Sequence, residues 1–323
     1  MSPTCDPFIT YFSSPDFLQL SLRFISILST PIFLLGTYCI LFKTPTQMNS
    51  VKYYMLSLHL AINLFDYSIS VLTIPYLLIP QFSGVLYGSF RSLGLPLSAA
   101  AMIPLIALAY TLITILGVYE NRFFILCEFR FKEKWKFWRR VWWAAHYIIA
   151  LALQIPIYYL IPNQETAKLI LFKNLPCLPE SFSNSPTIIV LATNYAYQIT
   201  YFLAFAITYC SEFFLFMGLL IRNSQKQSPT MSTKTYQMHK QFFKGLGIQL
   251  TIPLAMLAVP LFYLSLAVLI SYHNQAANNL CVLGVTTHGP LFTIVMLIVH
   301  NPYRLAIREL IRRDDQRIRG GRR

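Results

Sequence analysis

The chain has 323 residues, of which 55% are hydrophobic and only 12% are charged, and its net charge is +14. A soluble globular domain carries about 25% charged residues, so this composition excludes a soluble fold. The apolar stretches are continuous rather than alternating, which excludes a transmembrane β-barrel. The six cysteines are dispersed, without a CxxC pair, and no HExxH motif occurs. The sequence therefore predicts no metal, no cofactor and no enzymatic activity.

Seven apolar stretches reach the length of about 20 residues that crosses a bilayer as a helix. They cover residues 17–41, 54–80, 94–119, 141–161, 188–221, 246–270 and 280–300. We therefore predict an all-α membrane protein, a seven-helix bundle over residues 17–300. No basic residue precedes the first stretch, which is also too long for the core of a signal peptide, so we expect it to remain as an uncleaved span.

Lysine and arginine are shared unequally between the connecting segments. Segments 42–53, 120–140, 222–245 and 301–323 hold 22 of the 26, whereas 1–16, 81–93, 162–187 and 271–279 hold three. Cytoplasmic loops are those enriched in Lys and Arg. We expect a multi-pass protein of the cell membrane with residues 1–16 extracellular and 301–323 cytoplasmic. The same distribution explains the positive charge without nucleic-acid binding.

The second stretch carries polar residues at helical spacing: His59, Asn63, Asp66 and Ser70. Positions i, i+4, i+7 and i+11 share one helix face. Because a carboxylate facing lipid is costly, we expect this face to point into the bundle. Two interpretations stay open: a polar switch region or ion site, and a structural network that joins helices.

The segment after the seventh stretch has the pattern of an amphipathic helix, beginning at Asn301, Pro302, Tyr303 and Arg304. Apolar residues recur at i, i+3, i+4, i+7 and i+8: Tyr303, Ala306, Ile307, Leu310 and Ile311. A separate stripe contains Arg304, Arg308 and Arg312. Such a helix is expected to lie on the inner leaflet, with its basic stripe against anionic lipid.

Residues 119–140 form the most basic internal connection, and the four tryptophans lie in or next to it: Trp135, Trp138, Trp142 and Trp143. Tryptophan beside basic residues at the end of an apolar stretch is typical of a membrane boundary. On the opposite side, Cys5 and Cys177 are the first candidates for a disulfide and Cys177 with Cys281 the second, because that compartment is oxidising. Spacing does not choose between these pairs.

Seven spans, short outer loops, a basic second inner loop and an interfacial helix are the plan of a G-protein-coupled receptor. The sequence also resembles the nematode serpentine chemoreceptors of class H. The similar motifs are SPDF (14–17), GTYCILFKTP (36–45), M-x-SVK (48–52), LHLAINLFD (58–66), IPYLLIP (74–80), ENR (120–122), LPCLP (175–179), QLTIPLAMLAVP (249–260) and NPYR (301–304). The resemblance extends to about residue 310. It implies a chemosensory receptor of sensory-neuron cilia that couples to a heterotrimeric G protein.

Glu120-Asn121-Arg122 resembles the acidic-Arg-aromatic triplet at the inner end of the third span of rhodopsin-like receptors, which makes it the predicted coupling site. Residues i and i+2 of a helix point apart, so Glu120 and Arg122 are not expected to bind each other. The alternative is that Arg122 is only an interfacial charge. Asn301-Pro302-Tyr303 and Asp66 resemble, more loosely, polar positions in the seventh and second spans of the same receptors.

A ligand pocket is expected in the outer half of spans three, five, six and seven. The candidates for it are Met102, Asn194, Gln198, Tyr263 and His288. Since these outer halves carry no charged residue, the predicted ligand is a neutral or weakly polar small molecule. Two other functions stay open at this stage: a transporter or channel, and a receptor-like chaperone or co-receptor that has lost coupling.

Overall fold

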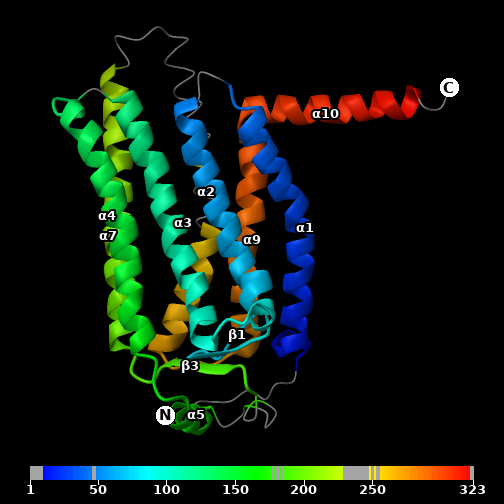
Figure 1. Cartoon of the computed structure of the whole chain (residues 1–323), viewed down its shortest axis with the longest axis vertical. Coiled ribbons are helices and arrows are strands. Elements are labelled where there is room, and N and C mark those ends of the chain that lie inside the picture. Colours follow the sequence, from blue (N-terminus) through cyan, green and yellow to red (C-terminus); the bar gives the residue numbers. More distant parts are fainter. Residues whose placement is uncertain are drawn as a thin grey trace.

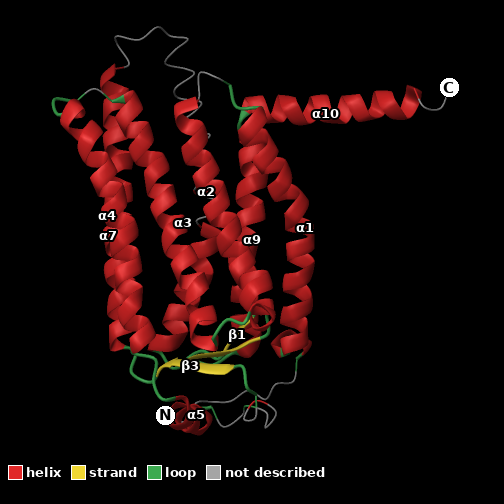
Figure 2. Cartoon of the chain, viewed as in Figure 1, coloured by secondary structure: helices red, strands yellow, loops and turns green. Residues whose placement is uncertain are grey.

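The computed structural model describes residues 10–45, 49–127, 129–175, 178, 182, 185–227, 247–248, 251 and 255–320. Long helices run side by side through the molecule (Figure 1). All strands lie at one end of these helices, and a further helix, α10, projects sideways at the other end (Figure 2). We call these the sheet end and the α10 end.

Six helices of the described residues are long and apolar enough to cross a membrane. They are α1 (Pro15–Phe42), α2 (Asn49–Tyr67) with its π-helical extension Ser68–Thr73, α3 (Leu97–Leu126), α4 (Lys132–Tyr159), α7 (Ala196–Gln227) and α9 (Gln275–Val299). A shorter apolar helix, Ala255–Leu269, lies between α7 and α9 in the sequence. The predicted seven-helix membrane bundle is confirmed.

Helix α3 is central to the bundle, because it packs against α2, α4 and α7. At its contact with α4, a Cβ added to Gly117 would lie 1.6 Å from the ring of Trp143, so only glycine permits this approach. Helices α4 and α7 turn large apolar side chains outward, among them Ile148, Ile155 and Ile207, each more than half exposed. An outward apolar surface is what a bundle presents to lipid, which is as apolar as these side chains.

The sheet end is covered by three antiparallel strands in the order β1 (Pro75–Leu77), β2 (Phe82–Leu86) and β3 (Ile188–Ala192). The short helices Tyr11–Ser13 and Ser89–Leu93 also belong to this end, and α5 (Gln164–Asn174) contacts β3 on the side away from the bundle (Figure 1). Tyr76 is fully buried here and donates its hydroxyl to the Ser13 carbonyl at 2.7 Å. The sheet thereby ties the connection after α2 to the segment before α1.

The predicted spans 54–80 and 188–221 are wrong at their sheet ends, where residues 75–77 and 188–192 are strands. Periodicity alone does not distinguish a buried strand from a buried helix when the apolar run is short. The helical segment ends at Ile74, whose φ is 42°, and Pro75 follows it. A left-handed β-branched residue and a proline both stop a helix.

The segment 120–140 is also different from the expected loop. Helix α3 continues to Leu126 and α4 begins at Lys132, so the connection contains only residues 127–131. Trp138 is exposed, as a membrane-boundary residue would be, but the other three tryptophans face the bundle. Trp142, for example, packs edge-on against Phe216 of α7 with ring centroids 5.8 Å apart.

Helix α10 (Asn301–Gly320) is docked by its first turns and leaves the bundle beyond them (Figure 1). Tyr303 and Ala306 are buried, and the Tyr303 hydroxyl lies 2.9 Å from Thr44 Oγ1 after α1. Leu310 and Ile311 of the same apolar stripe are exposed. Of the disulfide candidates, Cys5 and Cys177 lie outside the described residues, and Cys281 carries no disulfide.

Candidate functional site

Glu120 of α3 is fully buried at the α10 end of the bundle and is held by two side chains of α4. Arg139 Nη2 lies 2.7 Å from Glu120 Oε2, and Trp135 Nε1 donates to Glu120 Oε1 at 2.8 Å. A buried carboxylate requires a partner of this kind, because desolvation makes an unpaired charge very costly. The ion pair and the indole together neutralise and orient Glu120.

Arg139 joins three helices rather than two. Its Nη2 atom is also 3.1 Å from Asn121 Oδ1 of α3 and 3.1 Å from the Tyr54 hydroxyl of α2. The guanidinium carbon lies 4.2 Å from the ring centroid of Phe124, within the range of a cation–π contact. We call Tyr54, Glu120, Asn121, Trp135 and Arg139 the Arg139 cluster. It fixes the α10 ends of α2, α3 and α4 to one another.

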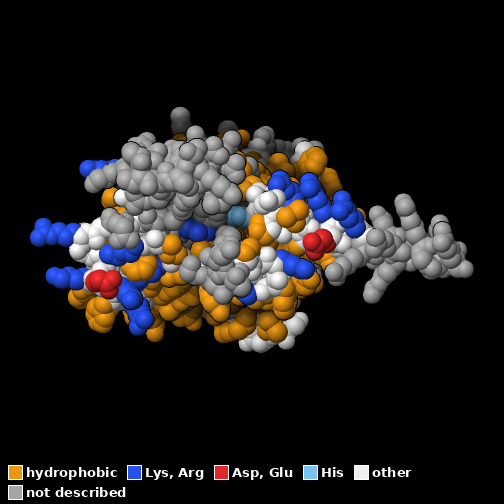
Figure 3. Space-filling view, turned by 90° about the horizontal axis from the view of Figure 1, so that it is seen from above, with side chains coloured by type: hydrophobic (Ala, Val, Ile, Leu, Met, Phe, Trp, Pro, Cys, Tyr) orange, Lys and Arg blue, Asp and Glu red, His pale blue; other side chains and the backbone are white. Residues whose placement is uncertain are grey.

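Arg122, two residues after Glu120, is buried and belongs to a different environment. Its charge acts on His300 and Tyr303, the residues at the junction of α9 and α10. Burial, together with the nearby Arg122 guanidinium, lowers the pKa of His300 to about 4, so this histidine is neutral at physiological pH. Figure 3 views this end face-on and shows exposed Lys and Arg side chains set around it.

The separation of Glu120 from Arg122 follows the expectation from helical spacing, but the sequence did not identify the partner of either residue. Trp135 and Arg139 are four residues apart, which puts them on one face of a helix. That signal was available in the sequence, yet their place in a basic segment suggested a loop. Only a helix beginning at Lys132 brings both side chains to Glu120.

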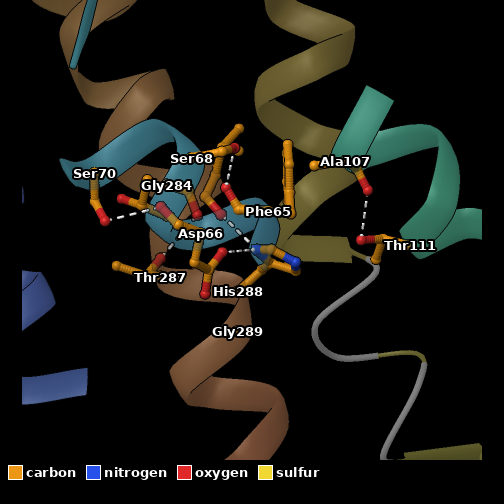
Figure 4. A network of polar contacts seen from close by, with 12 residues as sticks. Phe65, Asp66, Ser68, Ser70, Ala107, Thr111, Gly284, Thr287, His288 and Gly289 are labelled. Carbon is orange, nitrogen blue, oxygen red and sulfur yellow. Dashed lines mark hydrogen bonds and ion pairs between the residues drawn. The ribbon is translucent and has the colours of Figure 1, made fainter. Parts of the chain in front are cut away.

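The polar face of α2 meets two other helices. Near its middle, His59 Nε2 lies 3.1 Å from both the Phe33 carbonyl and Thr37 Oγ1 of α1, and 3.3 Å from Asn63 Nδ2. Further towards the sheet end, Asp66 lies 3.0 Å from His288 Nδ1 of α9 (Figure 4). Both partners of this second pair are buried. The face therefore joins α2 to α1 and α9.

Close packing holds Asp66 against α9. A Cβ added to Gly289 would lie 1.8 Å from Asp66 Oδ2, so the carboxylate occupies the space of the missing side chain (Figure 4). Ser70, the last member of the predicted face, is buried and donates its hydroxyl to the backbone carbonyl of Asp66 at 2.8 Å. His288, which is predicted to line a ligand pocket, is part of this network through its contact with Asp66.

The structure separates the other ligand-pocket candidates. Met102 is buried on α3 against Tyr201 of α7, and Gln198 is buried one turn before that tyrosine. Tyr263 is half-buried on the helix Ala255–Leu269 in another apolar cluster. Asn194 is exposed, and its Oδ1 accepts a hydrogen bond from the backbone N–H of Ala196 at 3.1 Å, which caps α7. Of these candidates, Met102 and Gln198 are the two associated with Tyr201 in the described residues, by packing and by sequence distance respectively.

A seven-helix membrane bundle with a helix projecting after the seventh is the architecture of a serpentine receptor. Comparison with known families gives the same answer. The family described as "Serpentine type 7TM GPCR chemoreceptor Srh" matches residues 13–313, and the chain belongs to this family. It is 24% identical to Serpentine receptor class H-72 of Caenorhabditis elegans, over 95% of this chain and 89% of that receptor. The predicted resemblance to class H chemoreceptors is confirmed.

Proposed function

We propose that this chain is a chemosensory receptor of the cell membrane, in sensory-neuron cilia, which binds a neutral small molecule near the sheet end. The α10 end is then cytoplasmic and couples to a heterotrimeric G protein, and residues 1–16 are extracellular. The distribution of Lys and Arg supports this orientation, because the described residues at the α10 end, in 120–140 and in α10, hold more of them than the described residues at the sheet end. Family membership supports a receptor over a transporter or channel.

The observation that carries the coupling proposal is that Glu120 and Arg122 have different surroundings. Glu120 is fixed to α4 by Arg139 and Trp135, whereas Arg122 is buried beside the α9–α10 junction. A small displacement of that junction changes the surroundings of Arg122 without breaking the Arg139 cluster. A ligand that binds the displaced packing better shifts the population towards it. Arg122 then becomes available to a cytoplasmic partner.

Helix α10 supports the same orientation. Arg304, Arg308 and Arg312 are exposed along it, as are the apolar Leu310 and Ile311. An exposed helix with separate apolar and basic stripes suits an anionic inner leaflet, where each charge contributes about 1 kcal/mol. Lipid contact would then hold α10 in place and, through Tyr303, the junction beside Arg122.

The test is Arg122→Ala in the full chain, expressed in reporter cells with a promiscuous G protein. Surface delivery is measured by antibody labelling, and second messenger is measured after exposure to volatile and water-soluble small molecules. We expect normal delivery with loss of the evoked signal. Arg130→Ala, which changes an exposed arginine of the connection between α3 and α4, is the matched control and should signal normally. Unchanged signalling by Arg122→Ala would exclude this residue from coupling, and ligand-evoked current without a G protein would favour a channel.

A further inference from the structure

A buried polar cluster lies between α3, α4 and α7 near the sheet end. Its members are Met102, Gln154, Ile157 and Tyr201, each at most 7% exposed, and we add Gln198 of α7, which is buried three residues before Tyr201. Gln154 of α4 donates through Nε2 to the Tyr201 hydroxyl of α7 at 2.7 Å. Met102 and Ile157 pack against the same tyrosine from α3 and α4. We call this the α3–α4–α7 cluster.

Two side-chain oxygens of the cluster have no protein partner among the described residues: Oε1 of Gln154 and Oε1 of Gln198. If the Gln154 amide were flipped, Oε1 would bond Tyr201 and Nε2 would be the atom without a partner, so one polar atom of this side chain lacks a partner in either orientation. A buried polar group without a hydrogen bond costs about 1–3 kcal/mol. A hydrogen-bond donor on a bound molecule would remove this cost at either oxygen.

The two amides are close to the sheet end of their helices. Gln154 is five residues before the end of α4, and Gln198 is the third residue of α7. Gln198 and Tyr201 are three residues apart, so they share a helix face. Since Gln154 bonds Tyr201, this face is the one that meets α4.

The rest of the cluster is apolar and uncharged. Leu105, Ile106 and Phe205 pack against Met102 and Tyr201. Methionine adapts its shape to irregular apolar contacts better than a branched side chain does. Immediately outside, Leu151 and Ile155 of α4 and Leu203 of α7 face outward, so the cluster adjoins the lipid-facing surface. These surroundings suit a lipophilic molecule without formal charge.

We propose that the α3–α4–α7 cluster binds a neutral small molecule that carries a hydroxyl or N–H donor. The donor bonds the side-chain oxygen of Gln154 or Gln198, and the apolar part lies against Met102, Ile157 and Phe205. Access is from the bilayer past α4 and α7, because the strands cover the sheet end. This inference rests on the proposed receptor function and names the ligand chemistry and its site.

The experiment uses the purified full chain in lipid nanodiscs, with 1-octanol, benzyl alcohol and phenol as probes and their methyl ethers as matched molecules without a donor. Thermal unfolding is followed at increasing probe concentration. We expect alcohols to raise the unfolding temperature at concentrations roughly tenfold below those of the ethers, the ratio that about one hydrogen bond provides. Gln154→Leu and Gln198→Leu should each remove this preference. Gln19→Leu, on α1 at the same end, is the control and should retain it.

Unfolding without a probe checks that the variants fold. Gln198→Leu removes an orphan oxygen and should unfold at or above the wild-type temperature, whereas Gln154→Leu loses the bond to Tyr201 and should unfold slightly below it. Equal effects of alcohols and ethers, or an unchanged preference in both variants, would overturn the site. Because no G protein is present, these results are independent of coupling. A retained preference for alcohols with no second-messenger response to them in cells would instead count against the proposed signalling function.

Discussion

Replacing Arg139 by glutamine should destabilise the receptor strongly, because Arg139 supplies the charge that compensates Glu120. Glu120 has no exposed side-chain surface, and that of Arg139 is 12% exposed, so solvent screens this pair weakly. Removing one partner of a buried ion pair costs about 3–5 kcal/mol, since the other charge stays buried and unpaired. Trp135 remains as a donor to Glu120 and places the expected loss towards the lower part of this range.

The measurement is equilibrium unfolding of the full chain in mixed micelles. Arg140→Gln is the matched control: it removes the same charge from the next residue, which is exposed, and should change the free energy of unfolding by less than about 0.5 kcal/mol. The double variant Glu120→Gln with Arg139→Gln should recover part of the loss, because no charge is then left without its partner. If Arg139→Gln proves as stable as Arg140→Gln, Arg139 does not compensate the buried charge of Glu120.

Two further predictions concern α9 and its junction with α10. Gly289→Ala should destabilise the chain by about 1–3 kcal/mol, because the added Cβ overpacks against Asp66. Gly218→Ala on α7 is the control and should be neutral or stabilising, because nothing lies within 4 Å of its added Cβ. The same unfolding assay compares the two variants, and equal stability would refute the packing argument. The pKa of His300 is about 4 in the folded chain against an ordinary 6.5, so the unfolded chain binds the proton more readily. Stability is fully present above pH 6.5 and should fall by up to about 3 kcal/mol as the pH decreases to about 4. His300→Gln should flatten this part of the pH profile, and an unchanged profile would exclude His300 as its source.

The Glu120-Asn121-Arg122 segment illustrates how far sequence reasoning reaches. The motif located the segment, and helical spacing correctly separated Glu120 from Arg122. The partners could not be predicted, because Arg139 and Trp135 reach Glu120 only through the packing of α4 on α3. Composition predicts a basic loop for those residues, because charge and tryptophan indicate the membrane boundary but not whether the backbone there is helical.

The ligand-site candidates illustrate the opposite case. The sequence indicates Met102 and Gln198 by their depth and polarity, and both are buried: Met102 packs against Tyr201 of α7, and Gln198 lies three residues before that tyrosine. The sequence does not indicate Gln154, because a single glutamine in an apolar span has no pattern of its own. The depth of His288 predicts a place in the pocket, and the structure adds its contact with Asp66, which the sequence does not predict.

The sequence by itself determined the membrane class, the seven spans and the family. These properties follow from one-dimensional quantities: the length of the apolar stretches and the order of the motifs. The tertiary structure decided which side chains meet: Glu120 with Arg139, Asp66 with His288, and Gln154 with Tyr201. It also decided that residues 75–77 and 188–192 are strands. The physical reason is that lipid is as apolar as most buried side chains, so the hydropathy of a span does not name its neighbours. Packing and the pairing of a few buried polar groups decide which helices meet.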